Sequence, residues 1–98
     1  MGRSPVLVHL SIHRPIPGRE QELIESMRRF GTADGEIPGL REVHTLRDRE
    51  TGALVGLAIW ESAHAFEAGA PRMRGAVEGD DFLEWEHGLP EVYVLEPA

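Results

Sequence analysis

Three polar side chains recur at alternate positions of an otherwise aliphatic segment near the start of the chain. In the segment 6–13, His9, Ser11 and His13 alternate with valine, leucine and isoleucine. Successive side chains of a β-strand point to opposite faces, so a strand here places both imidazoles and the hydroxyl on one face. An imidazole titrates near neutral pH, which suits a general base. We predict that His9 and Ser11 are catalytic and that His13 contacts the substrate.

Each of these residues also has a purely structural interpretation. His9 could be a core histidine whose ring is satisfied by neighbours, and His13 could be solvated beside the turn at Pro15. Buried polar groups without partners cost about 1–3 kcal/mol each, so two imidazoles and a hydroxyl between sheet and helices favour a bound ligand.

Four further residues are candidates for contacting the same ligand. His44 shares a strand face with Glu42 and could join the pocket or point to water. An aromatic ring can stack on a polycyclic ligand or pack in the core, and a ligand pocket needs mostly apolar walls. The predicted substrate-binding residues are therefore His13, His44, Trp60, Phe66 and Tyr93.

The residue types that are missing exclude several kinds of chemistry. The chain has no Cys, and all ten basic residues are Arg. Disulfides, thiolate nucleophiles, iron–sulfur clusters, lysine Schiff bases and P-loop lysines are therefore absent. No serine lies in a Gly-x-Ser-x-Gly elbow and no glycine-rich phosphate loop occurs, so neither a hydrolase nor a kinase is expected.

One group of residues has metal-ligand spacing. Asp80, Glu84 and His87 would share one face of a helix over 80–87, as the ligands of a carboxylate–histidine site do. The apolar stripe of that helix would be Phe82, Trp85 and Leu89. Because that stripe should be the buried one, the three polar residues should face solvent, and we expect no metal site and no cofactor.

The hydrophobic pattern predicts one small α+β domain over residues 1–98. Alternating or continuous apolar runs indicate strands, and apolar stripes between capping and stop residues indicate helices. A helix over 62–70 should start at the N-cap Ser62, and Pro71 should open a further turn to Val77. The predicted strands are 6–13, 40–46, 53–60 and 92–95, the helices are 19–30, 62–70 and 80–87, and a turn-rich connection spans 31–39.

This order of elements predicts a ferredoxin-like split βαβ fold, with a four-stranded antiparallel sheet and its helices on one face. The other face of the sheet would then be bare, and Val6, Val8, Leu10 and Ile12 would lie on it. A monomer of this size does not tolerate a large exposed apolar surface. We therefore expect a homodimer in which sheet packs against sheet.

Three motifs resemble those of a known family. Pro17-Gly18-Arg19-Glu20 follows the first strand, Ile37-Pro38-Gly39 precedes the second, and the segment 60–68 (WESAHAFEA) closes the third. Together they resemble the dimeric α/β-barrel superfamily typified by antibiotic biosynthesis monooxygenases, over about Val6 to Leu95. The resemblance implies a cofactor-independent monooxygenase acting on a small aromatic or polyketide-type quinol or anthrone, in which an imidazole removes a phenolic proton and the resulting anion reacts with O₂.

The chain also departs from that family. The haem-degrading branch has Asn where this chain has Ser11, and Trp, or in monooxygenase relatives often His, where this chain has Gly69. These substitutions disfavour haem degradation. The alternative to a monooxygenase is a noncatalytic dimeric protein of the same fold that binds a small ligand or serves a stress-related role. Fold resemblance alone does not separate these two functions.

The charge distribution bears on possible partners. The net charge is −7, and residues 75–98 carry seven acids and no base. An acidic segment repels a phosphate backbone, so no nucleic-acid partner is expected. No apolar run is long enough to span a membrane and no signal-peptide core precedes the first strand, so we expect a cytoplasmic protein.

Overall fold

A computed structural model describes residues 6–31 and 36–98. Residues 1–5 and part of the predicted connection at 31–39 lie outside these ranges. The elements are β1 (Leu7–His13), α1 (Glu20–Gly31), β2 (Leu40–Arg47), β3 (Leu54–Trp60), α2 (Ala63–Gly75), α3 (Phe82–Trp85) and β4 (Glu91–Leu95).

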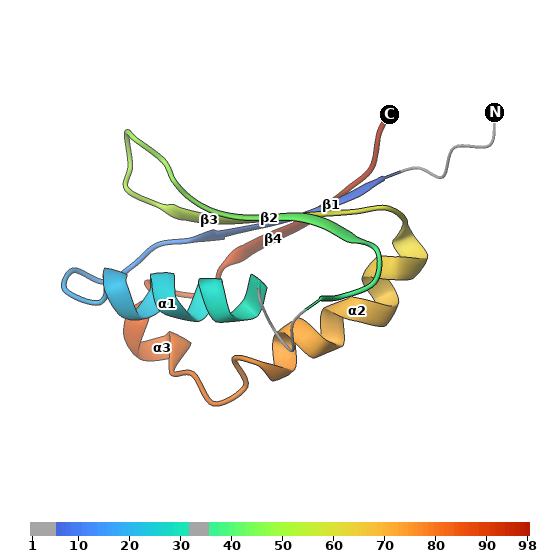
Figure 1. Cartoon of the computed structure of the whole chain (residues 1–98). Coiled ribbons are helices and arrows are strands. Elements are labelled where there is room, and N and C mark those ends of the chain that lie inside the picture. The colour runs from blue at the N-terminus through green and yellow to red at the C-terminus, as the bar shows by residue number, and fades with distance from the viewer. Residues whose placement is uncertain (1–5, 32–35) are drawn as a thin grey trace.

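The four strands form one antiparallel sheet in the order β2-β3-β1-β4. The helices lie on one side of it (Figure 1). Sheet order and helix placement confirm the predicted α+β ferredoxin-like split βαβ fold. The nearly continuous apolar run of β3 is explained by its interior place between β2 and β1.

Helix α1 covers one half of the sheet with the predicted apolar stripe. Leu23, Ile24 and Met27 are buried against Leu54 of β3, and Phe30 packs against the neighbouring core cluster. The spacing of three and four residues places these side chains on one face of the helix. The stripe fixes which side of α1 faces the β1 histidines.

Helix α2 is longer than predicted because it continues through Pro71. It begins as expected, with the Ser62 hydroxyl accepting a hydrogen bond of 3.1 Å from the Ala65 N–H. A proline inside a helix removes one backbone hydrogen bond. Burial of Ala70 and Met73 on either side of it offsets that loss and holds one helix to Gly75.

The second core cluster forms where α2 crosses the sheet. Leu7, Ile37, Ala58, Trp60 and Met73 are its buried members. Gly69 lets α2 approach closely, because a Cβ there would lie 2.7 Å from atoms of both Ile37 and Trp60. The indole therefore occupies the space that a side chain at position 69 would take.

Gly69→Ala is expected to lower the melting temperature. The added methyl group overpacks the contact with Trp60, at a cost of about 1–3 kcal/mol, or roughly 5–20 °C for a domain of this size. Thermal unfolding followed by circular dichroism measures the shift. Gly75→Ala is the matched control, because a Cβ there meets nothing within 4 Å. Equal melting temperatures for the two variants would contradict the close approach.

The prediction for 80–87 is wrong in extent, and its buried stripe is wrong at Leu89, whereas Phe82 packs against the core cluster of Leu23 and Leu54. Only Phe82–Trp85 is helical, because Glu86 turns to an extended backbone (φ −125°, ψ 153°). Leu89, expected to be buried, is 82% exposed. Asp80 and His87 lie outside the helix, so Asp80, Glu84 and His87 do not share one helical face. Asp80 instead forms an ion pair with Arg29 of α1 at 2.5 Å.

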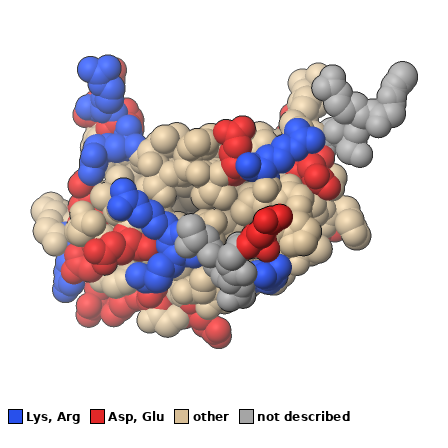
Figure 2. Space-filling view, viewed as in Figure 1, with Lys and Arg blue, Asp and Glu red and all other residues tan. Residues whose placement is uncertain are grey.

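Charged side chains of both signs intermix on the face shown in Figure 2. In the view of Figure 2, blue and red side chains lie next to each other along the lower part, and no broad basic patch forms on this face. Nucleic-acid-binding surfaces usually concentrate basic residues. Within the described ranges, none of the helices is both long and apolar enough to cross a membrane.

Candidate functional site

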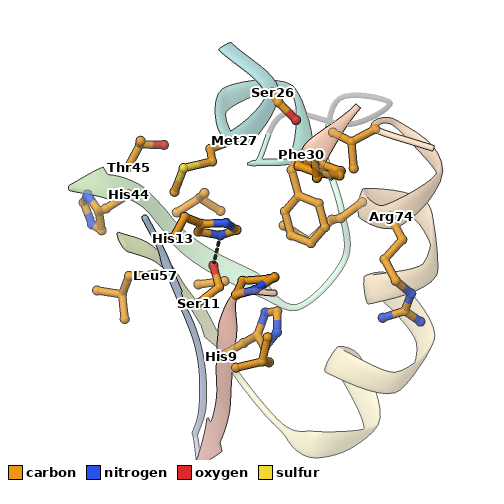
Figure 3. A pocket seen from close by; sticks show the side chains of 18 residues that line it. His9, Ser11, His13, Ser26, Met27, Phe30, His44, Thr45, Leu57 and Arg74 are labelled. Atoms are coloured by element: carbon orange, nitrogen blue, oxygen red, sulfur yellow. Dashed lines mark hydrogen bonds between the residues drawn. The ribbon is translucent and has the colours of Figure 1, made fainter. Parts of the chain in front are cut away.

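A pocket of about 350 Å³ lies between the sheet and the helices. β1 contributes His9, Ser11 and His13 to its wall (Figure 3). The rest of the lining is mostly apolar and includes Met27 and Phe30 of α1, Met73 of α2, Val77 and Phe82. An apolar cavity with a few convergent polar groups is the usual form of a small-molecule site.

Strand pairing places the three polar side chains opposite small or aliphatic residues. His9 pairs with Ala58, Ser11 with Gly56, and His13 with Leu54. A Cβ at Gly56 would lie only 2.8 Å from the Ser11 Oγ and 3.4 Å from the Met27 Cε. The glycine therefore leaves the Ser11 hydroxyl unobstructed on the side facing the pocket.

Ser11, His13 and Glu86 form a continuous hydrogen-bonded array. The His13 Nδ1 lies 3.0 Å from a Glu86 carboxylate oxygen, and its Nε2 lies 2.9 Å from the Ser11 Oγ. A carboxylate only accepts hydrogen bonds, so the His13 Nδ1–H donates to it; in the neutral ring the Nε2 then carries the lone pair that accepts from the Ser11 hydroxyl. The arrangement gives Ser11 a neighbouring base and gives that base a fixed tautomer.

Glu86 is held in place by backbone contacts between distant segments. Pro15 and Glu86 form an isolated antiparallel bridge. The Ile16 N–H donates to the Trp85 carbonyl, and the His87 N–H donates to the Arg14 carbonyl, both at 2.8 Å. The turn after β1 is thus bound to the end of α3, which places the Glu86 side chain beside His13.

The Glu86 carboxylate is unusual because it is almost completely buried. Its side chain is 1% exposed, and its second oxygen, Oε2, has no hydrogen-bond partner among the described residues. A buried carboxylate is unfavourable unless it is paired. His13 is the partner that stabilises it, which ties the two residues into one unit.

His9 lies in an aromatic environment on the same face of β1. Its ring centroid is 5.3 Å from that of Phe66 and 6.5 Å from that of Phe30. Burial, together with the positive charge of Arg74, lowers the pKa of His9 below its usual value. His9 is therefore neutral at pH 7 and can exchange hydrogen bonds with a ligand without carrying charge.

The lowered pKa of His9 predicts a pH dependence of stability. The unfolded state takes up a proton below about pH 6.5 and the folded state resists it, so stability falls as the pH drops from there through the folded pKa. His9→Phe removes this contribution while keeping an aromatic ring in place. The melting temperature of the variant should fall less than that of the wild-type protein between about pH 7 and pH 5. Parallel curves would contradict the prediction.

Two other polar groups line the pocket away from the array. The Ser26 Oγ of α1 is buried and has no hydrogen-bond partner among the described residues. The guanidinium of Arg74, on α2, forms no ion pair with any carboxylate of the described ranges. Both groups remain available to a bound molecule.

The structure separates the remaining predicted site residues from this pocket to different degrees. His44 borders it along β2, but its ring bonds Glu42 at 3.0 Å, and its side chain in Figure 3 points away from Ser11 and His13. Tyr93 pairs with Leu10, which puts it on the bare face of the sheet. Trp60 is fully buried in the core and packs edge-on against Phe66, which in turn contacts His9.

Glu86, Arg74 and Ser26 are the site residues that the sequence did not indicate. Glu86 lies 73 positions from His13 in the chain, and nothing in the local pattern marks it as a partner. Ser26 falls one position before Met27 of the apolar stripe, and that position is the only local hint of its burial.

Comparison with solved structures shows which proteins share this fold. The chain matches Rv0793 of Mycobacterium tuberculosis with 22% identity and a TM-score of 0.75, covering 97% of this chain and 96% of that one. It also matches a candidate antibiotic biosynthesis monooxygenase from Chloroflexus aurantiacus, with 18% identity, a TM-score of 0.68 and coverage of 95% and 93%. Another candidate monooxygenase of that kind, from Caulobacter crescentus, matches with 15% identity, a TM-score of 0.76 and coverage of 98% and 92%.

Sequence comparison adds no closer relationship. No protein-family model matches the chain, and no curated protein matches it. The structural likeness extends over nearly the whole chain, although the identities are low. The chain therefore has the fold of the antibiotic biosynthesis monooxygenase-like α/β-barrel proteins, as its sequence motifs predicted.

Proposed function

We propose that the protein is a cofactor-independent monooxygenase that oxidises a small aromatic or polyketide-type quinol or anthrone. The observation that supports this most is the Ser11–His13–Glu86 array, in which Ser11 and His13 line an apolar pocket and Glu86 bonds the far side of the His13 ring. The fold shared with candidate monooxygenases agrees with it.

The pocket suits a planar apolar ligand that carries few oxygens. Its volume of about 350 Å³ lies in the range of small-molecule sites. Met27, Phe30 and Phe82 provide apolar contact, and the polar β1 face provides hydrogen bonds along one edge. A phenol or enol oxygen would lie against Ser11, and neutral His9 would bond a second oxygen of the same ring system.

The array supplies a path for the substrate's proton. The hydroxyl of a phenol, or of the enol tautomer of an anthrone, donates to the Ser11 Oγ, and Ser11 passes its own proton to the His13 Nε2. The resulting imidazolium is stabilised by the Glu86 carboxylate at Nδ1. In this scheme His13 accepts the proton, and His9, the base favoured from sequence, orients the ligand instead.

The substrate itself supplies the electrons for the reaction with O₂. Deprotonation gives an electron-rich anion that reacts directly with O₂. For an anthrone, the methylene becomes a carbonyl, one oxygen atom of O₂ forms that carbonyl, and the other leaves as water with the two methylene hydrogens. The protein's part is to bind the substrate, hold it at the array and accept its proton.

Oxygen uptake tests the proposal directly. The purified protein, given anthrone or a dihydroxynaphthalene without flavin or added metal, should consume O₂ and form the corresponding quinone. His9→Ala should lower the rate, since the ring orients the substrate. If ligand raises the melting temperature while no O₂ is consumed, the protein is a binding protein and the proposal is wrong.

We also propose that two copies pack through the bare face of the sheet. β-Strand alternation places Val8, Leu10 and Ile12 there, opposite in direction to His9 and Ser11. The apolar surface continues across the neighbouring strands through Leu46, Val55, Leu57, Ile59, Tyr93 and Leu95. A two-fold dimer covers this face with an identical apolar face, and His44 and Tyr93 would then lie at the interface.

The mass measured by analytical ultracentrifugation should be that of a dimer for the wild-type protein and that of a monomer for Leu10→Arg.

A further inference from the structure

The Ser11–His13–Glu86 array has the connectivity of a nucleophile, its base and a carboxylate that orients the base. We propose that Ser11 is a nucleophile that accepts the acyl group of aryl esters, so that the protein is also a serine esterase. This activity is a second reaction of the same pocket and does not depend on whether the protein consumes O₂.

The geometry meets the requirements of a nucleophile–base pair. The His13 Nε2 is 2.9 Å from the Ser11 Oγ, within the reach of a general base, and the Glu86 oxygen is 3.0 Å from Nδ1. His13 is 9% exposed, and Glu86 is 4% exposed. Bulk water therefore does not compete strongly for the hydrogen bonds that hold the imidazole in place.

The surroundings of Ser11 leave room for an ester carbonyl. Gly56, its partner across the strand pair, has no side chain, and a Cβ there would contact the Ser11 Oγ. Met27 and Phe30 lie on the α1 side of the pocket and can hold an aryl or short acyl group. The pocket thus favours esters whose two halves are small and apolar.

One positively charged side chain borders the pocket at an exposed position. Arg74 lines the pocket and has no carboxylate partner in the described ranges. Its charge acts on His9, which lies on the same strand face two positions from Ser11. From that position its charge can lower the energy of the negative charge that forms on the tetrahedral intermediate.

The reaction balances without any added oxidant or cofactor. The Ser11 Oγ attacks the ester carbonyl, its proton passes to the His13 Nε2, and the C–O bond to the aryl oxygen breaks as the phenol leaves with that proton. Water then attacks the acyl-serine through the same base, releasing the carboxylic acid and restoring the hydroxyl. Ser11 does not lie in a Gly-x-Ser-x-Gly motif, but such arrays are identified by geometry rather than by a motif.

Labelling with a fluorophosphonate, followed by peptide mass spectrometry, tests the nucleophile. The Ser11 Oγ should form a bond to phosphorus as fluoride leaves, adding the phosphonyl mass to Ser11. Labelling should be absent in Ser11→Ala and should fall by about 10²-fold or more in His13→Gln and Glu86→Gln. Glu84→Gln and His87→Gln are matched controls on the same segment, since both side chains are exposed, and they should label like wild type.

Hydrolysis of p-nitrophenyl butyrate measures turnover in the same set of proteins. We expect the rate of p-nitrophenol release to decrease in the same order of variants as the labelling rate. Circular dichroism shows whether each variant is folded. The adduct on wild-type Ser11 tests the proposal even if a variant does not fold. No phosphonyl adduct on Ser11 of the folded wild-type protein, or an equal adduct on Ser26, would overturn the proposal. Normal O₂ uptake in that case would leave the monooxygenase proposal standing.

Discussion

His13→Gln is expected to lower the rate of O₂ consumption by about 10²–10⁴-fold, the usual contribution of a general base. Glutamine can still hydrogen-bond Ser11 and Glu86, but it cannot take up a proton at neutral pH. The substrate proton then has no acceptor, and the reactive anion does not form. Initial rates of O₂ uptake with anthrone, measured with an oxygen electrode, give the ratio.

His87→Gln is the control for this substitution, because it makes the same exchange at an exposed position close to the array. Its rate should equal that of the wild-type protein. Raising the pH should partly restore the His13→Gln rate, since a substrate that ionises in solution no longer needs the base. A His13→Gln rate close to wild type at neutral pH, with the fold intact, would remove His13 from the mechanism.

Glu86→Gln is expected to lower the same rate by about 10²-fold or more while the protein remains folded. The amide that replaces the carboxylate can donate to the His13 Nδ1, which shifts the ring proton to Nε2. His13 then has no lone pair facing Ser11, and the imidazolium loses the negative charge that stabilises it.

A structural role alone would give a different pattern. If Glu86 only packed against His13, Glu86→Gln would change the melting temperature and leave the pH–rate profile unchanged. A positioning role predicts a changed profile, because the carboxylate fixes the tautomer that presents the Nε2 lone pair to Ser11. Glu84→Gln, at an exposed position two residues away, should leave both rate and profile as they are in the wild-type protein.

Both activities proposed for the pocket begin with the same proton movement from Ser11 to His13. They differ in what lies against the hydroxyl. An acidic phenol or enol gives up its own proton through Ser11, whereas an ester carbonyl is attacked by Ser11 itself. Variants of His13 and Glu86 should therefore affect both reactions, and Ser11→Ala should abolish acyl transfer.

The order of elements and the orientation of β1 could be predicted from the residue pattern alone. The alternation in 6–13 is a local pattern. Since one face of the strand is apolar, His9, Ser11 and His13 could be placed together on the opposite face before any tertiary contact was known. The stripe Leu23, Ile24 and Met27 on α1 was predictable for the same reason. These patterns report local geometry, which a single sequence contains.

Which polar groups meet depends on contacts between segments that are far apart in the chain. Glu86 reaches His13 only because the segment 14–16 pairs with 85–87, a contact between distant parts of the chain. The helix predicted over 80–87 stops at Trp85 for the same reason, since Glu86 must adopt an extended backbone to make that bridge. Hydrogen bonding to a distant segment overrode the local helical pattern.

The positions of the other candidates were also decided by packing and register. Alternation gives the relative faces within β2 and β4, but only the pairing with β3 and β1 assigns His44 and Tyr93 to the bare side of the sheet. Trp60 fills the core because Gly69 lets α2 approach it. Local periodicity determines which side chains share one face of a strand or helix. Long-range strand pairing and close packing determine which other elements those side chains contact.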